Sequence, residues 1–235
     1  MKRIVGLAMI LMSAGLVVSP DSMALSLGEL DRRILACNQV LKSVLQMPDR
    51  GIPKDLFQRC RGLAVFPGVV KAGVVIGVSY GNGVILRRDE NTGEWTRPVF
   101  FTIRGASIGF QAGAQFTDLI LLVMSEQGVQ GLLEDQLILG ADVAVAVGPV
   151  GRQAAAETDM RLNTGILSYS RSKGLFAGVS LAGAVLAPDI AANEMYHGKG
   201  VTVQDVFYEN QGALSEGART LFQTLEEATQ QGESG

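Results

Sequence analysis

The sequence contains few of the residues on which metal sites and hydrolytic sites depend. Its 235 residues include one histidine and two cysteines, which excludes histidine-rich metal sites and leaves His197 as the only possible base of a Ser-His-acid arrangement. His197 lies in the loop-like segment "MYHGKG", where we expect it to be solvated. Acidic residues are scattered and nowhere show the D-x-D spacing of a calcium loop. We therefore expect no metal, no cofactor and no catalysis.

Aromatic residues are also scarce, at 6% of the chain, and charged residues make up 18%. Hydrophobic residues amount to 47%, and 29 glycines are spread along the sequence. A chain of this size and composition can bury a sizeable core in one domain, or at most two. That core must consist of Val, Ile, Leu and Ala side chains packed closely against glycine.

The first 24 residues resemble a secretory signal peptide. "MKR" supplies two positive charges, "IVGLAMILMSAGLVV" supplies a short apolar run, and "SMA" before Leu25 has the small-x-small form of a cleavage site. We expect cleavage after Ala24 and export to the periplasm or the envelope. The alternative is an uncleaved N-terminal anchor, although the run is short for a spanning helix of about 20 residues.

Such cleavage would leave an acidic protein with an uneven distribution of charge. It would reduce Lys+Arg from 20 to 18 and Asp+Glu from 23 to 22, for a net charge of −4. We therefore expect no nucleic-acid partner. Residues 50–173 carry 13 basic and 11 acidic side chains, whereas residues 174–235 carry two basic and eight acidic ones. An anion-binding surface is expected in the middle segment.

The two cysteines, Cys37 and Cys60, both follow the cleavage site. In an oxidising compartment we predict that they form a disulfide, which would stabilise the fold by roughly 3 kcal/mol on the chain-entropy model. Two buried thiols are the alternative.

Helical periodicity is confined to the two ends of the chain and to short segments. Residues 25–47 place apolar side chains at steps of three and four, which predicts an amphipathic helix. Its polar side is nearly charge-balanced, so we favour packing on the core over a position on a membrane surface. Short helices are expected in "PDRGIPKDLFQRCRG" and after Pro188, and residues 213–230 predict a final amphipathic helix.

From Val65 onward the periodicity changes to that of strands. "KAGVVIGVSYGNG" and "GASIGFQAGAQF" place small residues, mostly glycine, on one face and larger ones on the other. Because glycine weakens a strand, such a face indicates close approach of backbone, helix or ligand, and packing is the simpler interpretation. Further strands are expected in "TDLILLVMS", "ADVAVAVGPVGR" and "RLNTGILSYSRSKG". The pattern predicts an α+β fold, with a β-rich, mainly antiparallel, sandwich- or barrel-like sheet between an N-terminal amphipathic helix and a C-terminal helix.

Tyr169 and Lys173 lie four residues apart, as in the proton-transfer pair of short-chain dehydrogenases. In those enzymes the pair lies on a helix, and a strand, glycine-rich turn and helix hold the dinucleotide. Here the pair lies in a strand-like stretch, and no such unit precedes it. On a strand, residues four apart are separated by about 13 Å, so we do not assign the pair to catalysis.

Four ordered blocks together resemble the SYLF domain family. They are "LAVFPGVVKAGVVIGVSYGNGVILRR", "EWTRPVFFTIRGASIGFQAGAQFTDLILLV", "LGADVAVAVGPVGRQAAAETD" and "ILSYSRSKGLFAGVSLAGAVLAPD". The resemblance implies a SYLF-like lipid-binding domain over residues 25–210, followed by a C-terminal helix and tail over residues 211–235. In this family "SYSRSKGLFAG" is a signature stretch and not a dehydrogenase site.

The resemblance implies non-catalytic binding of anionic phospholipid, with phosphoinositide headgroups recognised by eukaryotic members. For an exported protein, phosphatidylglycerol, cardiolipin or another envelope lipid is the expected ligand, and the actin-associated role of eukaryotic members is not expected to transfer. The alternative is a structural or protein-interaction domain of the bacterial envelope without a lipid ligand.

Phosphate recognition requires fixed cations and free backbone N–H groups. Five cations lie in the matching blocks beside glycine-rich backbone: Lys71, Arg104, Arg152, Arg171 and Lys173. About half of them are expected to be solvated or structurally paired instead. Arg87 and Arg88 rank lower because acidic residues follow them in an expected hairpin tip.

Overall fold

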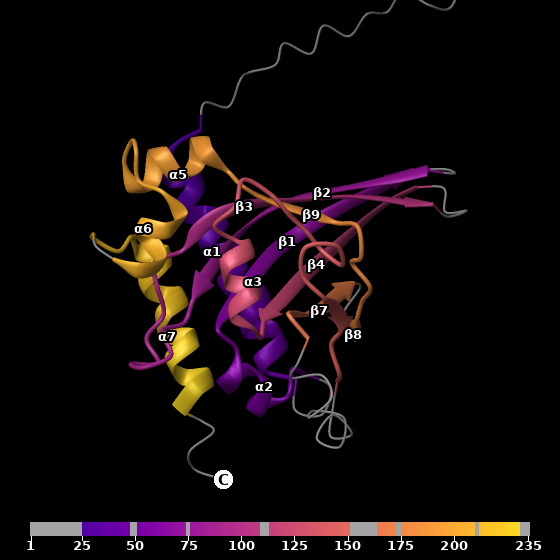
Figure 1. Cartoon of the computed structure of the whole chain (residues 1–235), viewed down its shortest axis with the longest axis horizontal. Helices are drawn as coiled ribbons and strands as arrows, with labels where there is room; N and C mark the ends of the chain where they lie inside the picture. Colours follow the sequence, from indigo (N-terminus) through magenta and orange to yellow (C-terminus); the bar gives the residue numbers. More distant parts are fainter. Residues whose placement is uncertain are drawn as a thin grey trace, which may run out of the picture.

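A single curled sheet with helices on both sides forms the molecule (Figure 1). The computed structural model describes residues 25–47, 51–73, 76–108, 113–150, 164–172, 175–209 and 212–230. The predicted α+β class with a mainly antiparallel sheet is confirmed, and the sheet curls into a half-barrel. Its strands are β1 (Gly62–Gly73), β2 (Ile76–Arg87), β3 (Val99–Ile108), β4 (Gly113–Val123), β5 (Leu137–Ile138), β6 (Val145–Val147), β7 (Ile166–Ser172), β8 (Leu175–Gly178) and β9 (Val185–Pro188).

The strand order is β5-β9-β3-β2-β1-β4-β7-β6, with β8 also paired to β7. Every described pairing between these strands is antiparallel except that of β6 with β7. The outer edge of β7 is therefore shared, because β6 pairs with its first half and β8 with its second half. The long strands β1 to β4 form the centre of the sheet and position the site described below.

Helices cover the sheet on both faces. Their bounds are α1 (Leu27–Leu45), α2 (Lys54–Arg59), α3 (Glu126–Gly131), α5 (Ile190–His197), α6 (Val203–Tyr208) and α7 (Glu216–Gln230). Helix α1 begins at the N-cap Ser26, whose hydroxyl accepts a hydrogen bond from the N–H of Glu29 at 3.2 Å. Within the described part of the chain, no helix is both long enough and apolar enough to cross a membrane.

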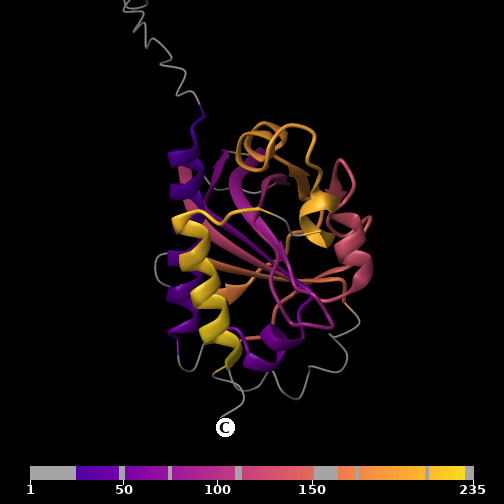
Figure 2. The ribbon, with the colours of Figure 1, turned by 90° about the vertical axis from the view of Figure 1, so that its left-hand side faces the viewer.

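The predicted amphipathic helix packs on the core. Leu30, Ile34 and Leu41 of α1 are fully buried against one face of the sheet. Helix α7 lies beside α1 (Figure 2) and adds Leu221 and Leu225 to the same core. The other face of the sheet has its own apolar core, which includes residues of α3 and α6.

Two stretches that the periodicity treats as continuous strands each span two strands. The first is a hairpin of β1 and β2, whereas β3 and β4 are separated in the sheet by β2 and β1. "KAGVVIGVSYGNG" spans the end of β1 and the start of β2, and "GASIGFQAGAQF" spans the end of β3 and the start of β4. The alternation of small and large residues persists through the first reversal because Gly73 pairs with Gly77, and paired residues share a face.

The packing interpretation of the glycine face is confirmed at two positions in β2. A Cβ atom on Gly83 would lie 2.1 Å from the carbonyl oxygen of Val65. One on Gly81 would lie 2.6 Å from a methyl group of Val69. Glycine is needed there because the neighbouring strand approaches closely.

Candidate functional site

The four central strands extend beyond the helices at one end of the molecule (Figure 1). We call this part the strand projection and define it as residues 69–73, 76–81, 104–108 and 113–117 of β1, β2, β3 and β4. Cross-strand pairing arranges its residues in rows that run across the strands in the order β3, β2, β1, β4. Adjacent rows point to opposite faces of the sheet.

One row of the strand projection combines a cation with exposed apolar side chains. It consists of Arg104, Tyr80, Val70 and Phe116, each paired with the next. Phe116 is 66% exposed and Tyr80 is 47% exposed. By strand alternation this row lies on the same face of the sheet as Phe100, which belongs to the core beneath α1. The Tyr80 hydroxyl donates to Oδ1 of Asn82 at 2.8 Å.

Two further side chains lie nearer the end of the strand projection. Val78 is on the same face as Tyr80 and is 62% exposed. Lys71 pairs with Ser79 and Gln115 and therefore lies on the opposite face. The projection thus presents one cation on each of its faces.

All charge in this region is positive. Residues 69–83 and 104–117 contain no acidic residue, and their charged residues are Lys71 and Arg104. Within the described residues, neither side chain has a hydrogen bond or an ion pair. Since both cations lack an internal acidic partner there, they are suited to bind an external anion.

Arg171 is placed differently. It lies on β7 opposite Asp118 of β4, and its Nε and Nη2 atoms donate to Asp118 Oδ2 at 3.0 and 2.8 Å. Asp118 Oδ1 accepts a third hydrogen bond from the N–H of Gly68 at 2.9 Å. Arg171 is therefore a partner in a structural ion pair that joins β7 to β4.

The five predicted cations thus do not form one described cluster. Lys71 and Arg104 share the strand projection, and Arg171 is paired beside it. Arg152 and Lys173 lie outside the described residues.

Comparison with known proteins identifies the family. The Ysc84 family, described as "Las17-binding protein actin regulator", matches residues 104–228, which is more than half of the chain. The chain belongs to the Ysc84 family. This confirms the SYLF resemblance of the sequence blocks.

Three relatives of this Ysc84 domain are eukaryotic proteins that are longer than this chain. Protein YSC84 of Saccharomyces cerevisiae is 36% identical over 157 residues, which cover 66% of this chain and 33% of the yeast protein. SH3 domain-containing YSC84-like protein 1 of Bos taurus is 29% identical over 184 residues, covering 78% of this chain and 53% of the relative. The Xenopus laevis protein of the same name is 34% identical over 153 residues, covering 65% and 45%. The chain spans about half the length of these relatives or less.

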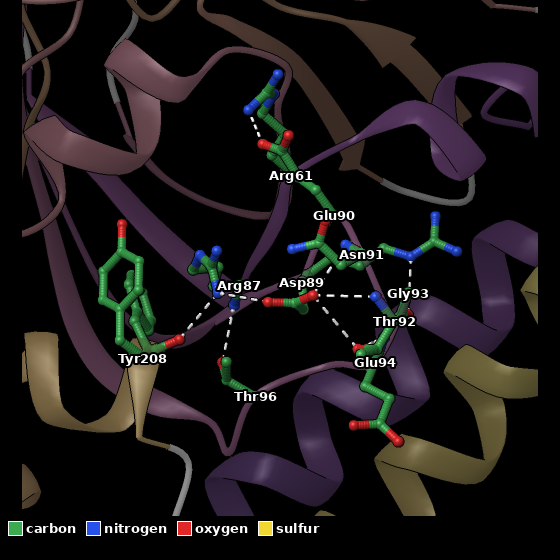
Figure 3. Close-up of polar contacts among 12 residues, drawn as sticks. Arg61, Arg87, Asp89, Glu90, Asn91, Thr92, Gly93, Glu94, Thr96 and Tyr208 are labelled. Carbon is green, nitrogen blue, oxygen red and sulfur yellow. Dashed lines mark hydrogen bonds and ion pairs between the residues drawn. The ribbon is translucent and has the colours of Figure 1, made fainter.

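The low ranking of Arg87 and Arg88 is supported by their contacts in the β2–β3 hairpin. Figure 3 shows Arg87 beside Asp89 and Tyr208, with its guanidinium 4.4 Å from the Tyr208 ring centroid. Its Nη1 atom donates to the carbonyl of Phe207 at 3.0 Å. Arg88 Nε donates to the carbonyl of Gly93 at 3.0 Å. In this Ysc84 domain Arg87 therefore joins the hairpin to α6, and Arg88 holds the hairpin turn together.

Tyr169 of the Ysc84 signature stretch is a core residue. It is fully buried, and its ring stacks on Phe176 with the centroids 5.4 Å apart. A Cβ atom on Gly148 would lie 2.2 Å from the Tyr169 ring, so the ring fills the space above that glycine. The strand position of Tyr169 is confirmed, whereas Lys173 lies outside the described residues.

Two segments have the G-x-S-x-G spacing of a serine nucleophile, but neither has the backbone turn that such a nucleophile needs. "GVSYG" and "GASIG" both read G-x-S-x-G, but Ser79 lies inside β2 and Ser107 inside β3. A nucleophile elbow needs a sharp turn from strand to helix, and neither serine occupies one. Within the described ranges, no group of three or more His, Cys, Asp or Glu side chains is placed to hold a metal ion.

The expectation of a solvated loop histidine is wrong for His197. This residue ends α5 and is partly buried, with Nε2 lying 3.0 Å from the carbonyl oxygen of Pro98. Burial, together with the positive charge of Arg97, lowers the pKa of His197 to about 4. The histidine is therefore neutral at pH 7.

The predicted disulfide is not formed in the structure, which instead shows the alternative of two buried thiols. Cys37 Sγ donates to the carbonyl of Val65 at 3.4 Å, and Cys60 Sγ donates to the carbonyl of Phe57 at 3.1 Å. Burial raises the pKa of each thiol to about 12. Each cysteine acts as a small core side chain with a backbone hydrogen-bond partner.

Proposed function

We propose that this protein is an exported, non-enzymatic binder of anionic phospholipid, with Lys71 and Arg104 as its headgroup contacts. The observation that carries this proposal is the charge of the strand projection, which is positive within a chain of net charge −3. Phosphatidylglycerol and cardiolipin are the ligands that fit export to a bacterial envelope. Arg152 and Lys173 remain predicted contacts.

Electrostatics favours a local and specific contact. An acidic protein is repelled overall by an anionic membrane, so attraction must come from cations within the Debye length of about 8 Å at physiological salt. Each Lys or Arg near an anionic surface contributes about 1 kcal/mol. Lys71 and Arg104 together therefore account for roughly 2 kcal/mol, or about thirtyfold in affinity.

Vesicle co-sedimentation tests the proposal. We expect the parent protein to bind phosphatidylglycerol or cardiolipin vesicles at low salt and not phosphatidylcholine vesicles. The Lys71→Gln/Arg104→Gln variant should bind about thirtyfold more weakly. Lys199→Gln/Arg219→Gln is the matched control, because it removes two exposed cations from the acidic C-terminal part. Equal loss in both variants would refute the assignment of the contacts.

Export is tested separately by intact mass. The protein recovered from the envelope fraction of a bacterial host should begin at Leu25. A chain that retains residues 1–24 would contradict cleavage and support the anchor alternative.

A protein-interaction domain is the second candidate function. It is favoured by the description of the family, which names Las17 binding and actin regulation. A parent protein that does not sediment with anionic vesicles at low salt would support this candidate and refute lipid binding.

A further inference from the structure

The strand projection has a graded arrangement of residues from its end inward. The outermost pair is Ile76 with Ile108. Inward from that pair, the rows that cross all four strands are first Ser107, Gly77, Gly73 and Gly113; second Ala106, Val78, Ala72 and Ala114; third Gly105, Ser79, Lys71 and Gln115; and fourth Arg104, Tyr80, Val70 and Phe116. The two outer rows contain no charged residue. The cations occupy the third and fourth rows, and the two aromatic residues occupy the fourth.

The spacing of these rows matches the depth of a bilayer interface. Successive residues of a strand are about 3.4 Å apart, so the third row lies about 10 Å and the fourth about 14 Å from the Ile76–Ile108 pair. Segments that bind in the interface bury their apolar part by about 5–10 Å. If the Ile76–Ile108 pair and the two rows next to it entered the acyl boundary, the cations would reach the level of the lipid phosphates.

The faces of the two cations select one orientation. Lys71 and Arg104 lie on opposite faces of the sheet, so a projection lying flat on a membrane would direct one of them away from it. When the strands meet the membrane by their ends, the two cations are about one row apart in depth, which is about 3.4 Å. Both can then contact headgroups at the same time.

We propose that the strand projection enters an anionic bilayer end-on, with Val78 deeper than Tyr80 and Phe116, and with Lys71 and Arg104 at the phosphates. This inference rests on the proposed lipid binding and adds an orientation and an apolar contribution to it. Tyr80 suits the level assigned to it because its amphipathic ring favours the interface between headgroups and acyl chains.

Charge argues for a membrane over a second copy of the chain as the occupant of this surface. A symmetric contact between two projections would place like patches against each other. It would bring the Lys71 and Arg104 cations of both copies together without an acidic partner from residues 69–83 or 104–117. A layer of phosphates is complementary to the same cations.

Tryptophan reporters test the depth and the orientation. The natural Trp95 is 6% exposed and serves as a constant background in the parent protein. In phosphatidylglycerol vesicles with brominated acyl chains, the Val78→Trp variant should be quenched more strongly than the Phe116→Trp variant. Ile190→Trp is the control, because Ile190 is 70% exposed on α5, far from the strand ends (Figure 1), and it should show only the background. Quenching of Ile190→Trp equal to that of Val78→Trp would overturn the orientation.

Serine substitutions test the apolar contribution. The Val78→Ser/Phe116→Ser variant should bind phosphatidylglycerol vesicles about tenfold more weakly or worse, because it removes two apolar side chains that enter the interface. Ile190→Ser should bind like the parent. The circular dichroism spectrum of each variant should match that of the parent, since all three positions are exposed.

The outcomes separate this inference from the proposed function. If the parent does not bind anionic vesicles, both fail. If the parent binds, while the Val78→Ser/Phe116→Ser variant binds equally well and the reporters in the projection are not quenched, insertion fails and electrostatic lipid binding stands. If the parent is a dimer without lipid and the same variant is a monomer by analytical ultracentrifugation, the surface is a contact between copies and the inference is overturned.

Discussion

The ion pair between Asp118 and Arg171 allows a quantitative test of how this domain uses its signature stretch. Asp118 receives two hydrogen bonds from Arg171, at 2.8 and 3.0 Å, and one from the N–H of Gly68 at 2.9 Å. The two side chains are 19% and 27% exposed. The change Asp118→Ala removes all three hydrogen bonds, whereas Arg171→Ala leaves the one from Gly68 in place.

The magnitudes follow from this difference. Hydrogen bonds to charged groups contribute roughly 1.5–3 kcal/mol, and solvent-exposed ion pairs contribute about 0–1 kcal/mol. For a partly buried pair we expect about 1–2 kcal/mol, with about 1 kcal/mol more for the Gly68 hydrogen bond. Asp118→Ala should therefore lower the free energy of unfolding by about 2–3 kcal/mol, and Arg171→Ala by about 1–2 kcal/mol.

Urea unfolding followed by Trp95 fluorescence measures these values. A double-mutant cycle that includes Asp118→Ala/Arg171→Ala should give a coupling energy of about 1–2 kcal/mol. Changes that simply add, to within about 0.3 kcal/mol, would show that Asp118 does not hold Arg171. Arg171 would then be available as a headgroup contact, as the sequence predicts.

Three further predictions concern the core. Cys37 and Cys60 should resist a thiol reagent at pH 8 in the folded protein, because burial raises both pKa values to about 12. Both should react in urea. If no free thiol is detected in urea, the two cysteines form the disulfide that the sequence predicts. Tyr169→Phe should cost about 1 kcal/mol of stability and leave vesicle sedimentation unchanged, and NAD(P)H binding that this change abolishes would contradict a structural role. The free energy of unfolding should fall by about 2 kcal/mol as the pH drops from 6.5 to 4, a value reduced to allow for the partial exposure of His197. The reason is that His197 binds a proton in the unfolded chain over this range, whereas in the folded chain, where its pKa is about 4, it stays neutral. His197→Gln should remove this part of the pH dependence of the free energy of unfolding measured in urea. An unchanged dependence on pH would contradict the role of His197.

The elements with strong periodicity could be predicted from the sequence. Helix α1 combines an apolar stripe with the N-cap Ser26, and both features are local. Strand β7 alternates as expected, with Tyr169 on the core face and Ser170 on the other. Each of these patterns depends on a single segment and on the face that it buries. Contacts with the rest of the fold therefore did not change the predicted helix or strand.

The strand reversals and α6 were harder to predict. Glycine and valine continue through the β1–β2 reversal without a change of period, so alternation alone cannot locate that turn. Helix α6 has only six residues, but its N-cap Thr202 and its third residue Asp205 form a capping box at its start. That S/T-x-x-D/E spacing is a signal in the sequence that would have indicated the start of the helix.

The placement of the cations depends on a single backbone irregularity that periodicity cannot show. In β1, Val65 faces the core beneath α1, so simple alternation would put Lys71 on that face too, together with Arg104. The pairing of β1 shifts between Val65 and Val70, where Gly68 adopts a positive φ of 56°, and Lys71 is moved to the opposite face. Such a bulge reverses every side chain beyond it.

The carboxylate that binds the N–H of Gly68 belongs to Asp118, the partner of Arg171. The ion pair in the signature stretch therefore supports the bulge that separates the two cations of the strand projection. We infer that Arg171 acts on the strand projection indirectly, because the acid that pairs with it also binds the backbone at the bulge that determines the face of Lys71.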